Sequence, residues 1–414
     1  MFDERSEQTR IERAIARALK EQPISRRLFL RRTGLVTASA LSLPAILAAC
    51  QAAPAASGGA ATIRWANWPA YIDIDEETGG YPTIEAFQEA TGHEVTYTEA
   101  VNDNEEFFGT INPALDAGQS TGWDLITVGG WLIERMVRLG YLQELDHAKL
   151  PNFAANGAEL YKNSWYDAGN THSVVWQAGI TGIGYDRDQT GRDITSFEDL
   201  LDPEFAGRVG MFSEMRDTLE LAILSLGVNP ADATTADATQ AQQKLLEAAE
   251  RGQFRNFYGN EYYDELAAGN LALSIAWSGD ITQMQLYDNP GDVQFVIPEE
   301  GGLRWTDNLA IPNGAANVDA VHQLINYWYD PAAATPLSEY IGYFTPVAGI
   351  AELIQADADE AREAGDVETA DALDAVAATV NPTEEQIANT HEDAPLDEAQ
   401  EAEWNALFLE VMAG

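Results

Sequence analysis

The chain has 414 residues and a formal charge of −44, because 67 aspartates and glutamates are set against 23 lysines and arginines. A chain this acidic is repelled by nucleic acid unless its basic residues form one patch, and no such patch is present, so nucleic acid is not expected as a partner. With 10 Trp, 15 Tyr and 14 Phe the chain should fold, and a single cysteine excludes a disulfide framework. The length suits two domains.

The first 49 residues resemble an export signal. Arg26 and Arg27 precede two apolar residues, and an apolar run of 16 residues extends from Gly34 to Ala49. A membrane-spanning helix needs about 20 apolar residues, so this run is typical of the apolar region of a signal peptide. The arginine pair resembles the twin-arginine signal, an address that a receptor reads.

Cys50 is the only cysteine of the chain, and it directly follows Leu47-Ala48-Ala49. This sequence resembles a bacterial lipobox, in which a signal peptidase cleaves before the cysteine and the thiol carries a diacylglycerol. The alternative is an N-terminal anchor helix with an incidental cysteine. We therefore expect a signal peptide over 1–49, lipid on Cys50, and a flexible tether over 50–61, where small residues dominate.

Strand and helix patterns then alternate along the chain. Their residue ranges are 63–68, 93–97, 123–128, 209–212 and 271–277 for strands, and 83–91, 104–117, 131–139, 218–226 and 239–251 for helices. Gly92 stands where the first helix should be capped, and Pro113 can break the second. This alternation predicts two α/β units with a mostly parallel sheet. Residues 351–414 are acidic, Ala-rich and helical in pattern, with a break at Asn381-Pro382, and we expect them on the surface.

The sequence carries no familiar catalytic or metal-binding motif. Its five histidines are scattered, and a nucleophile elbow, a P-loop and a dinucleotide fingerprint are all missing. The acidic run at 73–77 lacks the glycine that a calcium loop needs at its sixth position, where Thr78 stands. The adjacent Tyr262 and Tyr263 could bind ferric iron, but packing in a strand or core is the favoured interpretation. These residues favour neither a metal site nor a cofactor.

Tryptophans and carboxylates coincide near the ends of predicted strands. Trp68 and Trp277 each end a strand, Trp305 comes two residues before Asp307, and Glu214 and Asp217 follow the strand that ends at Phe212. Open α/β sheets bind ligands at this edge. Aromatic faces attract alkylammonium groups by about 0.5 to 2 kcal/mol each, and carboxylates accept their N–H donors. This combination favours an organic cation, the alternative being core tryptophans beside solvated acids.

Seven short motifs, each present once, are spread over almost the whole chain after residue 61. They are Asn67-Trp68 with Tyr71, Asn104-Glu105, Trp123-Asp124-Leu125-Ile126, Thr181-Gly182-Ile183-Gly184-Tyr185, Trp277-Ser278-Gly279, Trp305-Thr306-Asp307-Asn308-Leu309-Ala310-Ile311-Pro312 and Tyr340-Ile341-Gly342-Tyr343-Phe344-Thr345-Pro346. In order and approximate spacing they resemble the spermidine/putrescine-binding proteins of bacterial ABC importers. The resemblance implies an α/β, two-lobed periplasmic-binding-protein fold of type II with crossing hinge strands. One lobe would hold residues 62–179 and 306–350, the other 180–305 and 351–414.

The resemblance also implies that the protein performs no catalysis and is not an enzyme, and it implies the residues of the site. Its aromatic box and its amine-binding acids would be Trp68, Tyr71, Trp131, Trp277, Trp305 and Tyr343, and Glu214, Asp217 and Asp307. Asp307 would pair with one ammonium and the Glu214/Asp217 pair with another. The chain departs from the pattern where Gly129-Gly130 replace a hydroxyl that many relatives offer and where Pro69 replaces a residue that is often polar. Residues 352–380 look like an insertion.

The implied function is that of an exported, lipid-anchored binding protein. It would capture putrescine or spermidine between its lobes, as a monomer in the periplasm or at the outer face of the cytoplasmic membrane, and deliver it to a permease and its ATPase. One alternative keeps the fold and changes the ligand to a sugar, an iron complex or another organic cation. Another is an extracytoplasmic hydrolase, which needs two carboxylates about 5 to 9 Å apart in a groove.

Overall fold

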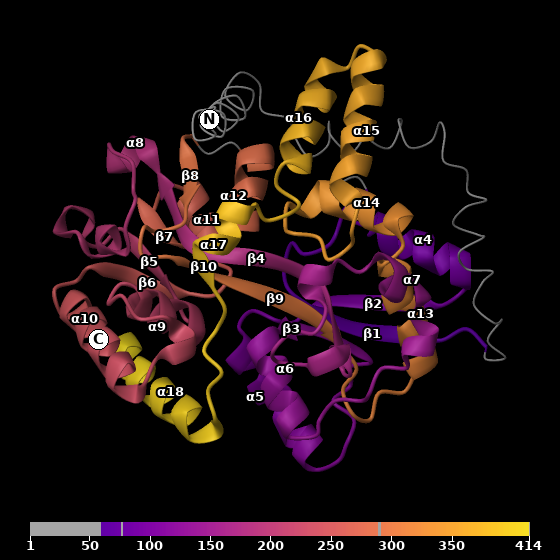
Figure 1. The fold of residues 1–414 in the computed structure, drawn as a ribbon, viewed down its shortest axis with the longest axis horizontal. Coiled ribbons are helices and arrows are strands. Elements are labelled where there is room, and N and C mark those ends of the chain that lie inside the picture. The colour runs from indigo at the N-terminus through magenta and orange to yellow at the C-terminus, as the bar shows by residue number, and fades with distance from the viewer. Residues whose placement is uncertain (1–58, 76–77, 289–290, 414) are drawn as a thin grey trace.

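The structure is a computed structural model that describes residues 59–75, 78–288 and 291–413 (Figure 1). The predicted signal peptide, Cys50 and residues 51–58 of the predicted tether lie outside the described residues. Within the described part of the chain, no helix is both long and apolar enough to cross a membrane.

The first part of the described chain alternates strands and helices in the predicted order. These elements are β1 (Thr62–Asn67), α4 (Pro82–Thr91), β2 (Glu94–Glu99), α5 (Asn104–Asp116), β3 (Leu125–Gly129) and α6 (Gly130–Arg138). Gly92 ends α4 in the left-handed conformation, with φ of 75°, as the sequence predicts. Pro113 does not break α5, because Phe107, Ile111 and Leu115 bury one face of the helix on both sides of the proline.

A long pair of antiparallel strands joins the two halves of the sheet. β4 (Ser173–Asp186) is buried along its whole length and pairs with β9 (Gly302–Ala310), from Ser173 opposite Ala310 to Thr181 opposite Leu303. On the other side β4 pairs with β7 (Leu273–Trp277), also antiparallel. The predicted, mostly parallel order therefore holds toward both ends of the sheet and is wrong at its centre, where the hinge strands cross from one half to the other.

The strands described form one sheet in the order β2-β1-β3-β9-β4-β7-β5-β6. The remaining strands are β5 (Val209–Phe212), β6 (Phe254–Tyr258), β8 (Val293–Val296), which pairs with β4, and β10 (Thr390–His391), which pairs with β9. The short helices between them are α7 (Pro151–Asn156), α8 (Arg187–Thr190), α11 (Tyr262–Ala267), α12 (Ser278–Gln283) and α17 (Glu384–Ala388).

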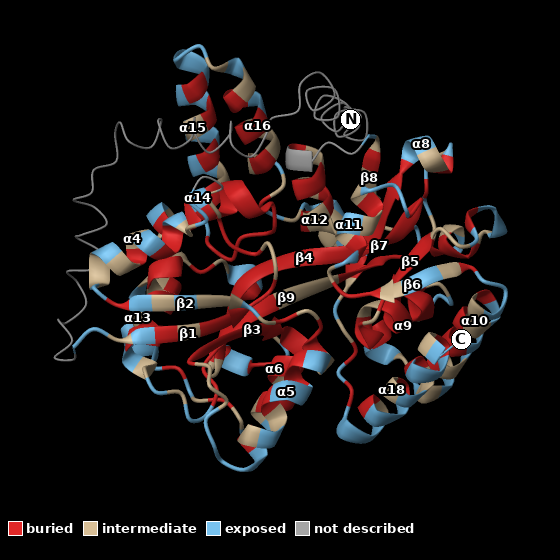
Figure 2. Cartoon of the chain, turned by 180° about the vertical axis from the view of Figure 1, so that it is seen from behind, coloured by how far each residue is buried: buried red, intermediate tan, exposed pale blue. Residues whose placement is uncertain are grey.

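Two large hydrophobic cores lie on either side of the hinge strands. The first is formed with the helices α13 (Val318–Trp328), α14 (Pro331–Ile341), α15 (Ile350–Glu363) and α16 (Val367–Ala377), and the second with α9 (Met215–Leu224), α10 (Thr235–Glu250) and α18 (Glu398–Ala413). Figure 2 shows strands buried between helices whose outer faces are exposed. This is the two-lobed α/β fold that the resemblance implied.

The segment 351–414, which we expected in the second lobe as a whole, divides its contacts between the two cores. Ile354 and Leu373 belong to the first core, whereas Trp404 and Phe408 belong to the second. Helices α15 and α16 form a hairpin that projects beside α14 (Figure 1). We propose that the boundary between the lobes falls between residues 380 and 394.

Candidate functional site

One cavity between the lobes collects residues from the carboxyl ends of the strands. All nine residues that the resemblance implies line it, namely Trp68, Tyr71, Trp131, Glu214, Asp217, Trp277, Trp305, Asp307 and Tyr343. They follow β1, β3 and β5, end β7, stand on β9 or follow α14. The cavity thus brings together side chains up to 275 positions apart, as the resemblance implied, although their contact with a ligand stays a prediction.

Aromatic rings of both lobes meet inside this cavity. Trp68 contacts Trp277 with ring centroids 6.1 Å apart, and Tyr71 contacts Tyr343 at 5.0 Å, both edge to face. Trp305 lies between Trp277, at 6.4 Å, and Tyr343, at 5.7 Å. Connected edge-on and tilted contacts of this kind hold the rings in place without stacking them face to face, so ring surface stays available to an alkyl chain.

Two glycines make room for these rings. A Cβ atom at residue 179, on β4, would lie 2.5 Å from the ring of Trp305, and one at residue 279, on α12, would lie 2.4 Å from the ring of Tyr343. Because real Cβ atoms do not approach so closely, Gly179 and Gly279 allow Trp305 and Tyr343 to reach the cavity.

Each of the three predicted carboxylates has a protein donor. The Tyr71 hydroxyl donates to Asp307 at 2.9 Å, and the Thr181 hydroxyl donates to Asp217. Glu214 accepts from Asn104, from its backbone N–H at 2.6 Å and its side-chain amide at 2.9 Å. These bonds fix the direction of each carboxylate and leave further acceptor positions for the donors of a ligand.

Two acids in the cavity were not among the predicted site residues. Asp280 accepts hydrogen bonds from the hydroxyls of Tyr262, at 2.6 Å, and Tyr343. Asp280 could have been predicted as a site residue, because it lies three residues after Trp277, which ends a strand. Asp393 precedes α18 and reaches the cavity from a distant part of the chain, and no residue pattern predicted its position there.

Tyr262, the possible iron ligand, is fully buried and donates to Asp280, which agrees with the packing interpretation. Within the residues described, no cluster of three His, Cys, Asp or Glu side chains could hold a metal ion.

Burial raises the pKa of the carboxyl groups in the cavity. The pKa of Asp217 and that of Asp307 rise to about 7, and those of Asp280 and Asp393 to about 6. The pKa of Glu214 lies well above its usual value, because the group is buried and close to Asp103 and Asp217. Five desolvated acids at one place favour a ligand that brings positive charge.

Trp131 differs from the other aromatic residues of the cavity. The guanidinium groups of Arg135 and Arg216 lie over its ring, 5.0 Å and 5.1 Å from the centroid. These two cations already use the attraction that its ring could offer an ammonium group. We therefore expect Trp131 to shape the cavity wall, with less direct contact to a ligand amine than the resemblance implied.

The departure at Gly129-Gly130 has a steric cause. A Cβ atom at residue 130 would lie 2.6 Å from the ring of Tyr166, whose hydroxyl contacts Thr306 at 2.7 Å and donates to Asn308 at 2.9 Å. The Gly129 N–H donates to the side chain of Asn104, which in turn donates to Glu214. Glycine at 130 thus lets a tyrosine from another loop pack against this wall of the cavity.

Comparisons with known proteins agree with this architecture. Residues 83–364 match the family model for bacterial extracellular solute-binding proteins. The chain is 30% identical to spermidine/putrescine-binding periplasmic protein 1 of Haemophilus influenzae, over 75% of this chain and 84% of that protein. It is 29% identical to the putrescine-binding periplasmic protein PotF of Escherichia coli, over 72% and 81%.

Solved structures show the same fold. A protein of Listeria monocytogenes, described as a spermidine/putrescine ABC transporter, superposes with a TM-score of 0.70 at 26% identity, covering 84% of this chain and 98% of that one. The Tp0655 lipoprotein of Treponema pallidum gives a TM-score of 0.67 at 19% identity, covering 85% of this chain and 100% of the other, and shows the fold alone. The chain belongs to the family of bacterial extracellular solute-binding proteins.

Proposed function

We propose that the chain is the substrate-binding protein of a bacterial ABC importer and that it captures a polyamine, putrescine or spermidine, between its lobes. The observation that carries this proposal is the cavity itself, which five carboxyl groups with raised pKa values line together with a set of aromatic rings. Protonated amines supply the charge and the N–H donors that these acids need, and methylene groups fit between rings. Relatives named for binding spermidine and putrescine support the same ligand class.

In this proposal the acids form separate amine sites. Asp307, oriented by Tyr71, receives one ammonium group, and Glu214 with Asp217 receives another. Asp280, oriented by Tyr343, lies on the second lobe's side of the same cavity. Closing the lobes over the ligand removes water from these pairs, so the spacing between amines sets the ligand preference.

The proposal includes the location and the partners of the protein. Cys50 carries a lipid that holds the chain at the outer face of the cytoplasmic membrane, and residues 50–61 tether the monomeric binding domain to it. The lobes then deliver the polyamine to a permease and its ATPase. The lipobox-like sequence before Cys50 and membership in an extracellular solute-binding family support this arrangement.

A thermal-shift screen of the purified mature protein tests the ligand class. We expect putrescine or spermidine to raise the melting temperature, because a ligand at 100 times its Kd stabilises the folded state by about 2.7 kcal/mol. Sugars, amino acids and ferric citrate should leave it unchanged. A shift with a sugar or ferric citrate alone would instead favour the other ligands considered for this fold.

Gly279→Ala should weaken polyamine binding by about 10- to 100-fold, the range for losing one hydrogen bond to a charged group. The new methyl group would overlap the ring of Tyr343 and force its hydroxyl away from Asp280. Titration calorimetry measures the effect. Gly109→Ala is the control, since its Cβ would meet nothing within 4 Å in α5, and equal affinities of the two variants would contradict the prediction.

A further inference from the structure

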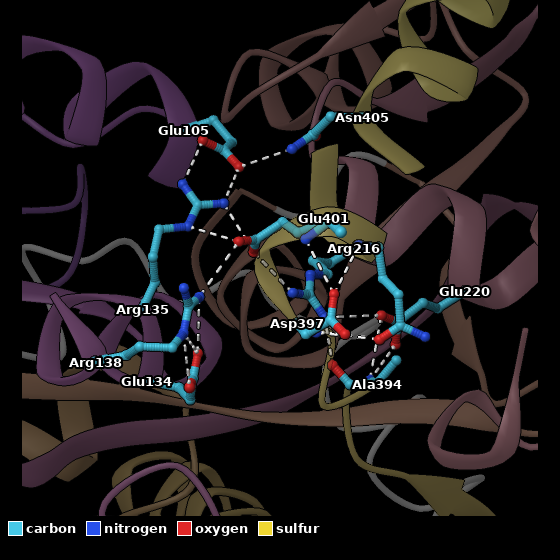
Figure 3. A network of polar contacts seen from close by, with 12 residues as sticks. Glu105, Glu134, Arg135, Arg138, Arg216, Glu220, Ala394, Asp397, Glu401 and Asn405 are labelled. Carbon is cyan, nitrogen blue, oxygen red and sulfur yellow. Dashed lines mark hydrogen bonds and ion pairs between the residues drawn. The ribbon is translucent and has the colours of Figure 1, made fainter. Parts of the chain in front are cut away.

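A network of buried ion pairs joins the two lobes beside the cavity (Figure 3). Its centre is Glu401, on α18 of the second lobe, which contacts arginines of both lobes. Arg135 of α6 lies 2.8 Å from it and Arg216 of α9 lies 2.9 Å from it. Arg138, also on α6, approaches to 3.7 Å. The side chains of Arg135, Arg216 and Glu401 are 10%, 4% and 8% exposed, so these charges depend on one another.

The network can separate along the boundary between the lobes without isolating an arginine. Arg135 also donates to Glu105 of its own lobe at 2.8 Å, and Arg216 lies 3.5 Å from Glu220 of its own lobe. Opening the lobes breaks the contacts of α6 with Glu401, yet Glu401 keeps Arg216. Each arginine therefore keeps a carboxylate partner in its own lobe after separation. Opening then costs less free energy than it would if every ion pair of the network crossed between the lobes.

The same network reaches the ligand cavity through two residues. Arg216 is the one basic side chain among the described residues that line the cavity, and Glu401 and Glu220 hold its guanidinium. Trp131, also in the lining, packs under the guanidinium groups of both Arg135 and Arg216. The contacts across the lobes thus lie next to the cavity that the lobes enclose.

We propose that Glu401 is a positioning residue for lobe closure. It acts as a latch, because it holds Arg135 of the first lobe next to Arg216 of the second and so sets the rate at which a bound ligand leaves. This proposal rests on the proposed function, because a captured polyamine escapes only when the lobes open. Glu401 acts through the two arginines, since it is not part of the cavity lining.

Stopped-flow kinetics with putrescine and spermidine on E401Q tests the proposal. We expect the dissociation rate constant to rise at least tenfold and the association rate constant to change by less than threefold. Asp124→Asn is the matched control, because Asp124 is a buried acid that pairs with Arg64 at 3.0 Å within the first lobe. The control should lower the melting temperature and leave the dissociation rate unchanged, which separates a latch from a general loss of stability.

The dissociation rates of the two variants can also contradict the proposal. A dissociation rate in E401Q that stays within twofold of the wild type overturns the latch, and so does an equal increase in Asp124→Asn. If the wild type binds neither polyamine, the proposed function fails, and small-angle scattering of the ligand-free proteins then tests the latch alone. A larger radius of gyration for E401Q supports it, and equal radii overturn it.

Discussion

Asp307→Asn should lower the affinity for putrescine or spermidine by about 10- to 100-fold. Asp307 stands on the hinge strand β9, is 7% exposed and is oriented toward the cavity by the Tyr71 hydroxyl. Asparagine keeps the size of the side chain and removes its charge, so one ammonium group loses a charge-assisted hydrogen bond. Such bonds contribute about 1.5 to 3 kcal/mol, which is the stated range in affinity.

Titration calorimetry at pH 8 and low salt measures this effect, since the pKa of Asp307 is raised by burial to about 7 and the carboxyl group is ionised at that pH. Asp124→Asn removes the same charge from a buried site in the first lobe that does not line the cavity. It should bind with wild-type affinity. Unchanged binding by Asp307→Asn would show that Asp307 does not receive an amine.

Residues placed directly after strands could be predicted well from the sequence. Trp68, Glu214 and Trp277 stand where strands end, and the carboxyl edge of a parallel sheet brings such positions together. The hinge was harder to predict from residue patterns. β4 is buried on both faces, so its side chains show no alternation between polar and apolar residues that would mark a strand.

The C-terminal segment shows where sequence reasoning ends. Asp393 and Glu401 lie in an acidic stretch whose composition is typical of a solvated surface, yet Glu401 is buried and Asp393 lines the cavity. Both acids interact with Arg216, which lies 185 positions before Glu401, and Glu401 also pairs with Arg135. A spacing pattern does not reveal such long-range pairs. The cations over Trp131 were missed for the same reason, although Arg135 is only four residues away.

Acidification from pH 8 to pH 6 should weaken polyamine binding by about 100-fold. Burial raises the pKa of Asp217 and of Asp307 to about 7, so both groups are largely ionised at pH 8 and largely protonated at pH 6. Each protonation that binding must reverse costs about tenfold in affinity over this range. The ligand keeps its charge, because the ordinary pKa of an alkylamine is near 10.

The other charged groups at the cavity do not reverse this trend. Asp280 and Asp393, with pKa values raised by burial to about 6, add to the loss of affinity near pH 6. Glu214, whose pKa burial raises well above its usual value, acts in the same direction. Calorimetry at pH 7 in buffers of different ionisation enthalpy should detect the release of at least about one proton on binding, since Asp217 and Asp307 are each half protonated at this pH and must ionise.

The stability of the ligand-free protein should change in the opposite direction. A carboxyl group whose pKa is higher in the folded state than the unfolded value of 3.8 binds more protons when folded, so the free energy of unfolding increases as the pH falls from 8 toward 5.5. Acids whose pKa is lowered, such as Glu105 and Asp124, oppose this only at more acidic pH. A melting temperature that rises while affinity falls distinguishes titration of the cavity from acid unfolding, in which both would fall together.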